Sequence, residues 1–168
     1  MESKRFQLAQ ANVARMRAPL QDPIMEGFRS QLERINAVAD ASPGFVWRLQ
    51  TEDGDATAIR AFDDDRIIFN MSVWESREAL HEYVYRSDHL GPLRNRREWF
   101  EPMDGPILVL WWIPAGHVPT VEEAKGKLRV LKESGPTQDA FTFRQSFPPP
   151  GQDGPPAPEL DAEFCESA

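Results

Sequence analysis

Two of the three histidines stand where an imidazole can move protons. His89 follows Asp88 at a predicted break between helical pieces, and an unperturbed histidine titrates near neutral pH, which suits a general base. His117 lies in a loop beyond an apolar strand, and such loops often carry function. Each has a structural alternative: His89 can bond a backbone carbonyl and fix the turn, and His117 can cap the helix that follows. Asp88 either orients His89 or caps the next helix.

Two clusters of charge also have a functional and a structural interpretation. Arg97 lies in a basic cluster at residues 94–97, which can receive an anionic substrate group. Solvated pairing with the carboxylates of residues 98–104 is the favoured interpretation. The run Asp63–Asp65 can attract a cation, but adjacent carboxylates on an extended chain point in different directions, and the spacing of a calcium loop is absent. We therefore expect no metal site.

Aromatic side chains offer the walls of an apolar cavity. Tyr83 and Tyr85 lie on opposite sides of a predicted helix, so at most one of them lines a pocket. Trp111 can wall the same pocket, although most tryptophans are more simply core. The sequence has no nucleophile elbow, phosphate-binding glycine loop, dinucleotide fingerprint or zinc motif. What remains is chemistry that needs an apolar cavity and one or two proton-handling groups.

The composition indicates one folded domain with an acidic tail. The 168 residues carry a net charge of −8, with 40% hydrophobic residues. Residues 148–168 are Pro-rich and acidic without Lys or Arg, so we expect a domain over residues 1–147 and a flexible tail after it. The acidity argues against nucleic acid. The longest apolar run, Ile107–Ile113, is too short for a membrane helix, and no secretory signal opens the chain, so we expect a cytoplasmic protein. The single Cys165 excludes an intramolecular disulfide.

Periodicity places these residues on secondary structure. Alternating patterns predict strands over residues 5–13, 45–49, 67–74 and 107–113. A first helix begins at the N-cap Asp22, with an inward face that we take to be Ile24, Phe28, Leu32, Ile35 and Val38. Ser76 caps a second helix, and a short helical piece follows over residues 90–99. The capping box Thr120–Glu123 opens a third helix that ends at Gly135-Pro136, before an aromatic arm at residues 141–147.

The order of these elements predicts an α+β fold. Strand, helix, strand, strand, helix, strand is the βαββαβ arrangement of a ferredoxin-like domain with an antiparallel sheet, here with an extra C-terminal helix and arm. The strand at residues 107–113 has no polar face. We expect helices to cover one face of the sheet and a second subunit to cover the other, on which Trp112 lies. The expected assembly is a homodimer that forms a dimeric α/β barrel.

Several short motifs resemble an uncharacterised bacterial family within the dimeric α/β-barrel superfamily, which includes the antibiotic-biosynthesis monooxygenases. They are SVWESREAL at residues 72–80, YRSDH at 85–89, RREWF at 96–100, WWIPAGH at 111–117 and FTFR at 141–144. The likeness spans roughly residues 5–150. It implies the fold and the dimer, but it leaves the chemistry open, because the superfamily includes oxygenases, haem enzymes, isomerases, dehydratases and cyclases.

The resemblance also implies a site. Oxygenases of the superfamily commonly carry an Asn and a Trp on one strand, near a helical His, and Asn70 and Trp74 fit that pattern. Four residues apart on a strand, they share one face, where the amide can hold a phenolate or carbonyl oxygen beside a flat indole. Haem-binding relatives have a histidine at the helical position that Tyr83 occupies in this sequence, and His81 of this sequence lies nearby. This departure from the haem-binding pattern weakens the haem interpretation, but a tyrosinate can also ligate iron, so haem stays possible with His81, Tyr83 or His89 as ligand candidates.

These observations lead to a small homodimeric enzyme that acts on an aromatic or polyketide-like metabolite by cofactor-free, monooxygenase-like chemistry. His89 is its general base, Asn70 and Trp74 complete the catalytic set, and Tyr83 contacts substrate. The other expected substrate contacts are Trp111, His117 and Arg97. Two alternatives remain: a non-catalytic or haem-dependent binder of an apolar small molecule, or an isomerase, dehydratase or cyclase that uses the same pocket.

Overall fold

The computed structural model describes residues 6–50, 60–86 and 96–152. Its strands are β1 (Phe6–Met16), β2 (Phe45–Arg48), β3 (Ile67–Trp74), β4 (Phe100–Glu101) and β5 (Leu108–Pro114). Its helices are the 3-10 turn η1 (Pro23–Met25), α1 (Glu26–Arg29), α2 (Leu32–Ala41), α3 (Arg77–Arg86), α5 (Arg96–Trp99) and α6 (Val121–Ser134). Asp88, His89, Arg94 and Cys165 lie outside the described residues, as do residues 153–168 of the predicted tail.

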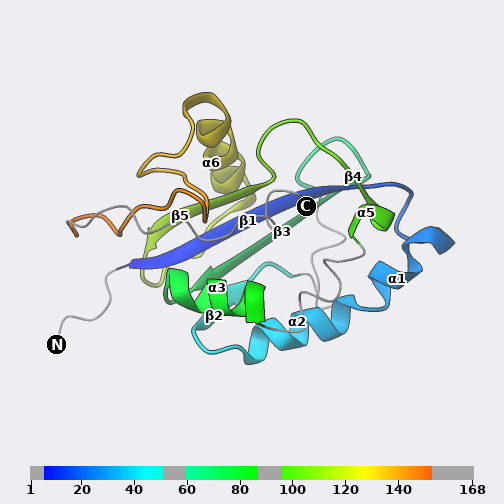
Figure 1. Cartoon of the computed structure of the whole chain (residues 1–168), viewed down its shortest axis with the longest axis horizontal. Coiled ribbons are helices and arrows are strands. Elements are labelled where there is room, and N and C mark those ends of the chain that lie inside the picture. Colours follow the sequence, from blue (N-terminus) through cyan, green and yellow to red (C-terminus); the bar gives the residue numbers. More distant parts are fainter. Residues whose placement is uncertain (1–5, 51–59, 87–95, 153–168) are drawn as a thin grey trace.

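The described strands form an antiparallel sheet with β1 at its centre (Figure 1). Residues 8–12 of β1 pair with β3 on one side and with β5 on the other, and β2 lies beyond β3. The core order is therefore β5-β1-β3-β2, in which the two βαβ units of the chain interleave. This order confirms the predicted ferredoxin-like α+β fold. The short β4, which the sequence did not predict, continues the β5 side of β1 through Arg15 and Met16.

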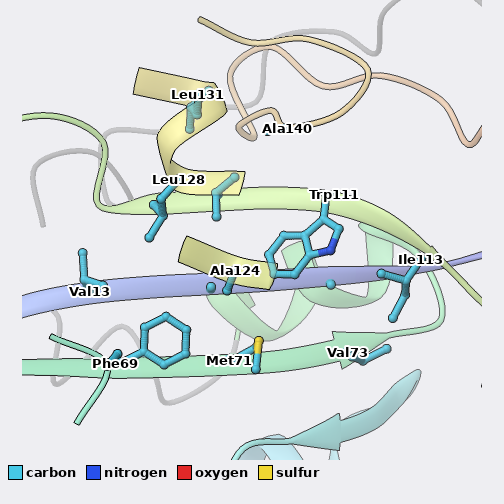
Figure 2. Close-up of a cluster of buried hydrophobic side chains, with 14 residues drawn as sticks. Val13, Phe69, Met71, Val73, Trp111, Ile113, Ala124, Leu128, Leu131 and Ala140 are labelled. Carbon is cyan, nitrogen blue, oxygen red and sulfur yellow. The ribbon is translucent and has the colours of Figure 1, made fainter. Parts of the chain in front are cut away.

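Helices lie on both sides of this sheet, with α6 on one side and α1, α2 and α3 on the other (Figure 1). On the α6 side, β1, β3 and β5 bury a cluster that Figure 2 shows beneath the helix. Its largest members are Phe69, Met71 and Trp111, and Ala124, Leu128 and Leu131 of α6 pack onto them. These three residues are the buried positions of α6, and their spacing of four and three places them on one face of the helix.

The face that carries Trp112 is covered by the same chain, whereas we expected a second subunit to cover it. Trp112 is half-buried, and its indole Nε1 donates to the carbonyl oxygen of Phe147 at 2.8 Å. Phe141 forms a backbone bridge to Leu110 of β5, and Phe143 packs in the same cluster. The apolar pattern of β5 correctly predicted burial on both sides. It did not distinguish a second subunit from the aromatic arm, because a hydrophobic pattern specifies burial without specifying the partner.

The first helical segment begins as predicted but is interrupted. The Asp22 side chain accepts a hydrogen bond from the Ile24 amide at 3.0 Å and so caps η1. The prediction that Ile24 faces inward is wrong: it is 50% exposed, and Met25 is buried in its place. A 3-10 turn has three residues per turn instead of 3.6, so it rotates the inward position by a residue relative to a continuous α-helix.

Later elements follow their local signals closely. β3 has the predicted bounds, and Ser76 Oγ accepts from the Ala79 amide at 3.1 Å at the start of α3. Thr120 caps α6, and Gly135 ends it with a φ of 71°. Within the described residues, no helix is both long enough and apolar enough to cross a membrane.

Candidate functional site

A row of polar side chains crosses the face of β1 and β3 that lies on the side of α2 and α3, away from α6. We call this row the polar belt. It consists of Gln10, Asn12, Asn70, Ser72 and the indole N–H of Trp74. Gln10 lies directly opposite Ser72, and Asn12 lies directly opposite Asn70, so these four side chains share one face. None of the five carries a charge. The same-face placement of Asn70 and Trp74 agrees with the prediction from their spacing.

Hydrogen bonds join most of the belt into one chain. The Trp74 indole Nε1 donates to Ser72 Oγ at 2.8 Å, and Gln10 Nε2 donates to the same oxygen at 2.8 Å. Asn12 Nδ2 donates to Gln10 Oε1 at 3.4 Å. Gln10 and Ser72 are only 5% and 7% exposed, so these bonds supply partners that buried polar groups require.

The belt is closed at Trp74 and open at Asn70. Trp74 is fully buried in an apolar cluster with Leu8, Leu80 and Val84. At the other end, Ala14, Met16 and Ile68 belong to a second apolar cluster. Between the two clusters, Asn12 is half-buried and Asn70 is exposed. The exposed part of the belt is therefore its amide groups, between two buried apolar clusters.

Tyr83 of α3 covers the Trp74 ring. The two rings stack with their centroids 5.0 Å apart and their planes at 24°, while Phe45 meets the indole edge-on. The Tyr83 hydroxyl lies 3.5 Å from the Ile35 carbonyl oxygen. Burial raises the pKa of Tyr83 well above its usual range, although the nearby Arg48 guanidinium opposes this shift. Tyr83 therefore stays a neutral phenol, and its ring packs on the indole of Trp74.

The surroundings of Tyr83 and His81 bear on whether either side chain could ligate haem iron. A tyrosine that ligates iron does so as a phenolate, and the buried, stacked Tyr83 does not fit that role. His81 is half-buried with its ring 4.3 Å from that of Tyr85 and 6.1 Å from that of Phe143. His89, the remaining ligand candidate, lies outside the described residues.

Trp111 and His117 occupy a different place from Asn70 and Trp74. Trp111 lies on the α6 side of the sheet and is 1% exposed. Its Nε1 donates to Glu123 Oε2 at 3.1 Å, and His117 Nε2 lies 2.8 Å from Glu123 Oε1. Trp111 therefore lies on the other face of the sheet from Trp74, because Trp111 is opposite Ala9 and Trp74 is opposite Leu8, and adjacent positions of a strand point to opposite faces.

Arg97 and the acidic residues considered with the charge clusters make contacts outside the hydrogen-bonded belt. Arg97 is exposed on α5, where its carbonyl oxygen accepts from Arg17 Nε at 2.7 Å. Glu101, which we expected to pair with the basic cluster, lies 3.5 Å from Arg15 Nε. Asp64, in the acidic run considered for a cation, lies 3.2 Å from the same guanidinium. In the described part of the chain, no three His, Cys, Asp or Glu side chains group as a metal site would require.

The sequence interpretation missed Gln10, Asn12 and Ser72. A signal for them was present, because Gln10 and Asn12 alternate within a strand whose other residues are largely apolar. Polar residues at alternate positions of a buried strand fall on one face. Pairing them with Ser72 needed the register between β1 and β3, which the sequence does not supply.

The fold and the belt define a ferredoxin-like α+β protein with an amide-lined face on its central strands. The chain belongs to the family described as a domain of unknown function (DUF3291), whose model matches residues 7–156. This membership confirms the resemblance to an uncharacterised family. No curated protein matches the chain.

Several solved structures are similar to this chain at low identity. The Pseudomonas aeruginosa protein PA3566 is 13% identical, with a TM-score of 0.44 over 70% of this chain and 100% of its own. SnoaB, a cofactor-independent oxygenase from Streptomyces nogalater, is 18% identical, with a TM-score of 0.41 over 67% of this chain and 95% of its own. A dabb family protein with a ferredoxin-like fold from Mesorhizobium loti is 16% identical, with a TM-score of 0.41 over 68% of this chain and 98% of its own. Similarity at this level transfers no activity to this chain.

Proposed function

We propose that this protein is an enzyme that binds an aromatic or polyketide-like metabolite at the polar belt and oxygenates it without a cofactor. The observation that carries the proposal is the exposed Asn70 amide, directly opposite Asn12, between two apolar clusters. Neutral amides can hold a phenol or phenolate oxygen, and apolar walls suit the rings that bear it. The absence of charge among the five belt groups favours a ligand that arrives neutral.

The proposed reaction follows from that arrangement. A general base takes the phenol proton, and the amides of Asn70 and Asn12 stabilise the oxyanion, so that electron density rises on a ring carbon. That carbon bonds to molecular oxygen, and loss of water from the resulting hydroperoxide leaves a quinone. For 1-naphthol the balance is C10H8O + O2 → C10H6O2 + H2O. The base in this proposal is His89, assigned from the sequence and the family resemblance.

Oxygen uptake with 1-naphthol as the probe tests the proposal. We expect one O2 consumed per 1,4-naphthoquinone formed, above the rate of uncatalysed autoxidation. Asn70→Ala should lower kcat/KM by about 100-fold, the usual effect of losing one oxyanion donor, and His89→Ala should do the same or more. Asn36→Ala, a half-buried change on α2, is the matched control and should leave the rate unchanged. Wild-type turnover in Asn70→Ala would refute the proposed site.

Binding without oxygen uptake would favour the non-catalytic alternative. In that case the belt holds an apolar ligand, and Asn70→Ala weakens binding while no product forms.

The homodimer expected from the resemblance is also part of the proposal, and native mass spectrometry measures it. One chain already covers both faces of β5, so a dimer would need another surface.

A further inference from the structure

The hydroxyl of Ser72 lies at the centre of the belt with both of its lone pairs in use. It accepts one hydrogen bond from the Trp74 indole and a second from the Gln10 amide, each at 2.8 Å. An indole N–H only donates, so Ser72 must act as an acceptor toward Trp74. A serine hydroxyl has two acceptor sites and one hydrogen, so the group left to Ser72 is its O–H donor.

That donor has no acceptor among the described residues. Ser72 is 7% exposed, and the two belt residues that form hydrogen bonds with its hydroxyl are both donors. A buried donor without an acceptor is destabilising, and an oxygen of a bound ligand would satisfy it. Asn70, two positions along β3 on the same face and so roughly 7 Å from Ser72, is exposed.

We propose that Ser72 donates a hydrogen bond to a carbonyl or phenol oxygen of the ligand, and that Gln10 is a positioning residue that orients this hydroxyl. The inference rests on the proposed function and deepens it by naming the group that the site recognises. Gln10 is held in turn, because its Oε1 accepts from Asn12. The belt therefore presents donors and selects a neutral ring system with an oxygen acceptor over the corresponding hydrocarbon.

The test compares two probes that differ in one oxygen, 1-tetralone and tetralin, by NMR titration of the full chain. We expect the wild type to bind tetralone more tightly than tetralin. Ser72→Ala should weaken tetralone binding by about five- to tenfold, the usual effect of losing one hydrogen bond, and leave the affinity for tetralin unchanged. Ser72→Thr keeps the hydroxyl on a strand that tolerates β-branching, so it should retain the preference. Gln10→Leu should lose part of the preference for tetralone over tetralin.

Ser146→Ala is the matched control. Ser146 is also fully buried, and its hydroxyl has no hydrogen-bond partner in the described part of the chain. This change should leave the ratio of the two affinities as in the wild type. Because Ser72→Ala also leaves Trp74 and Gln10 without their acceptor, circular dichroism must first show that the variant is folded at the titration temperature.

The outcomes separate this inference from the proposed function. Equal weakening of both probes in Ser72→Ala, or an unchanged tetralone preference, overturns the role of Ser72 and leaves the oxygenase proposal to the naphthol assay. A preference that depends on Ser72, without oxygen uptake from 1-naphthol, supports the inference and refutes the oxygenase. If a folded wild type binds neither probe, both proposals fail.

Discussion

Glu123 connects the first turn of α6 to the sheet, and its removal gives the most quantitative prediction. Its Oε2 accepts from the Trp111 indole at 3.1 Å, and its Oε1 lies 2.8 Å from His117 Nε2. The two partners differ in environment: Trp111 is 1% exposed, whereas the His117 side chain is 41% exposed. We expect the bond to the buried indole to dominate the contribution of Glu123 to stability.

The magnitude follows from these exposures. Glu123→Ala leaves a buried indole N–H without an acceptor, which costs about 1–3 kcal/mol. Losing the exposed contact with His117 adds about 0.5 kcal/mol. The sum, about 2.5 kcal/mol in free energy of unfolding, is a change of about 70-fold in the unfolding equilibrium. For a chain of this size it lowers Tm by about 5–10 °C.

Urea denaturation of a double-mutant cycle measures this prediction. Phenylalanine has no N–H, so Glu123→Ala should cost only about 0.5 kcal/mol in a Trp111→Phe background. His117→Ala alone should cost less than about 1 kcal/mol. Glu122→Ala, at an 85% exposed side chain in the same helical turn, is the control and should stay within about 0.5 kcal/mol. The reasoning is refuted if Glu123→Ala costs the same with and without the Trp111 indole.

Two further predictions concern Tyr83 and Gly44. Because burial raises the pKa of Tyr83, its phenol stays protonated in the folded state; the associated stability is fully present below about pH 10 and is lost as pH rises above that value. In urea melts, Tyr83→Phe should therefore reduce the loss of stability at alkaline pH. It should leave the phenolate absorbance titration of the native protein unchanged, and a smaller amplitude of that titration would contradict the protonated state of Tyr83. Gly44 has a φ of +82°, and an added Cβ would lie 2.5 Å from that of Ala79, so Gly44→Ala should cost about 3 kcal/mol. Gly135→Ala, with a φ of +71° and no atom within 4 Å of the added Cβ, should cost about 1–2 kcal/mol, and equal costs would exclude the contact with Ala79.

Local signals were sufficient where an element is defined by its own residues. The bounds of β3, the Ser76 and Thr120 caps and the Gly135 terminus follow from alternation and capping chemistry within a few residues. The first helix shows the limit of that approach. Its N-cap was correct, but the choice between a 3-10 turn and an α-helix determines whether Ile24 or Met25 is buried.

The candidate site shows the same division. A period of two placed Asn70 and Trp74 on one face, as the structure has them. The sequence could not pair Gln10 with Ser72, because cross-strand partners depend on the register between strands far apart in the chain. Nor could it place Trp111 and His117 beside Glu123, since that contact forms only when α6 packs on the sheet.

The sequence by itself determined the order of the four long strands and the helices between them, the ferredoxin-like fold class, and the apolar character of both faces of β5, since each depends on residue type and period. Tertiary structure decided what covers those faces and which polar groups meet. In one chain, α6 covers the Trp111 face and the aromatic arm at residues 141–147 covers the Trp112 face. The physical reason is that hydrophobic burial is non-directional and accepts any apolar partner, whereas a hydrogen bond requires particular atoms to lie about 3 Å apart.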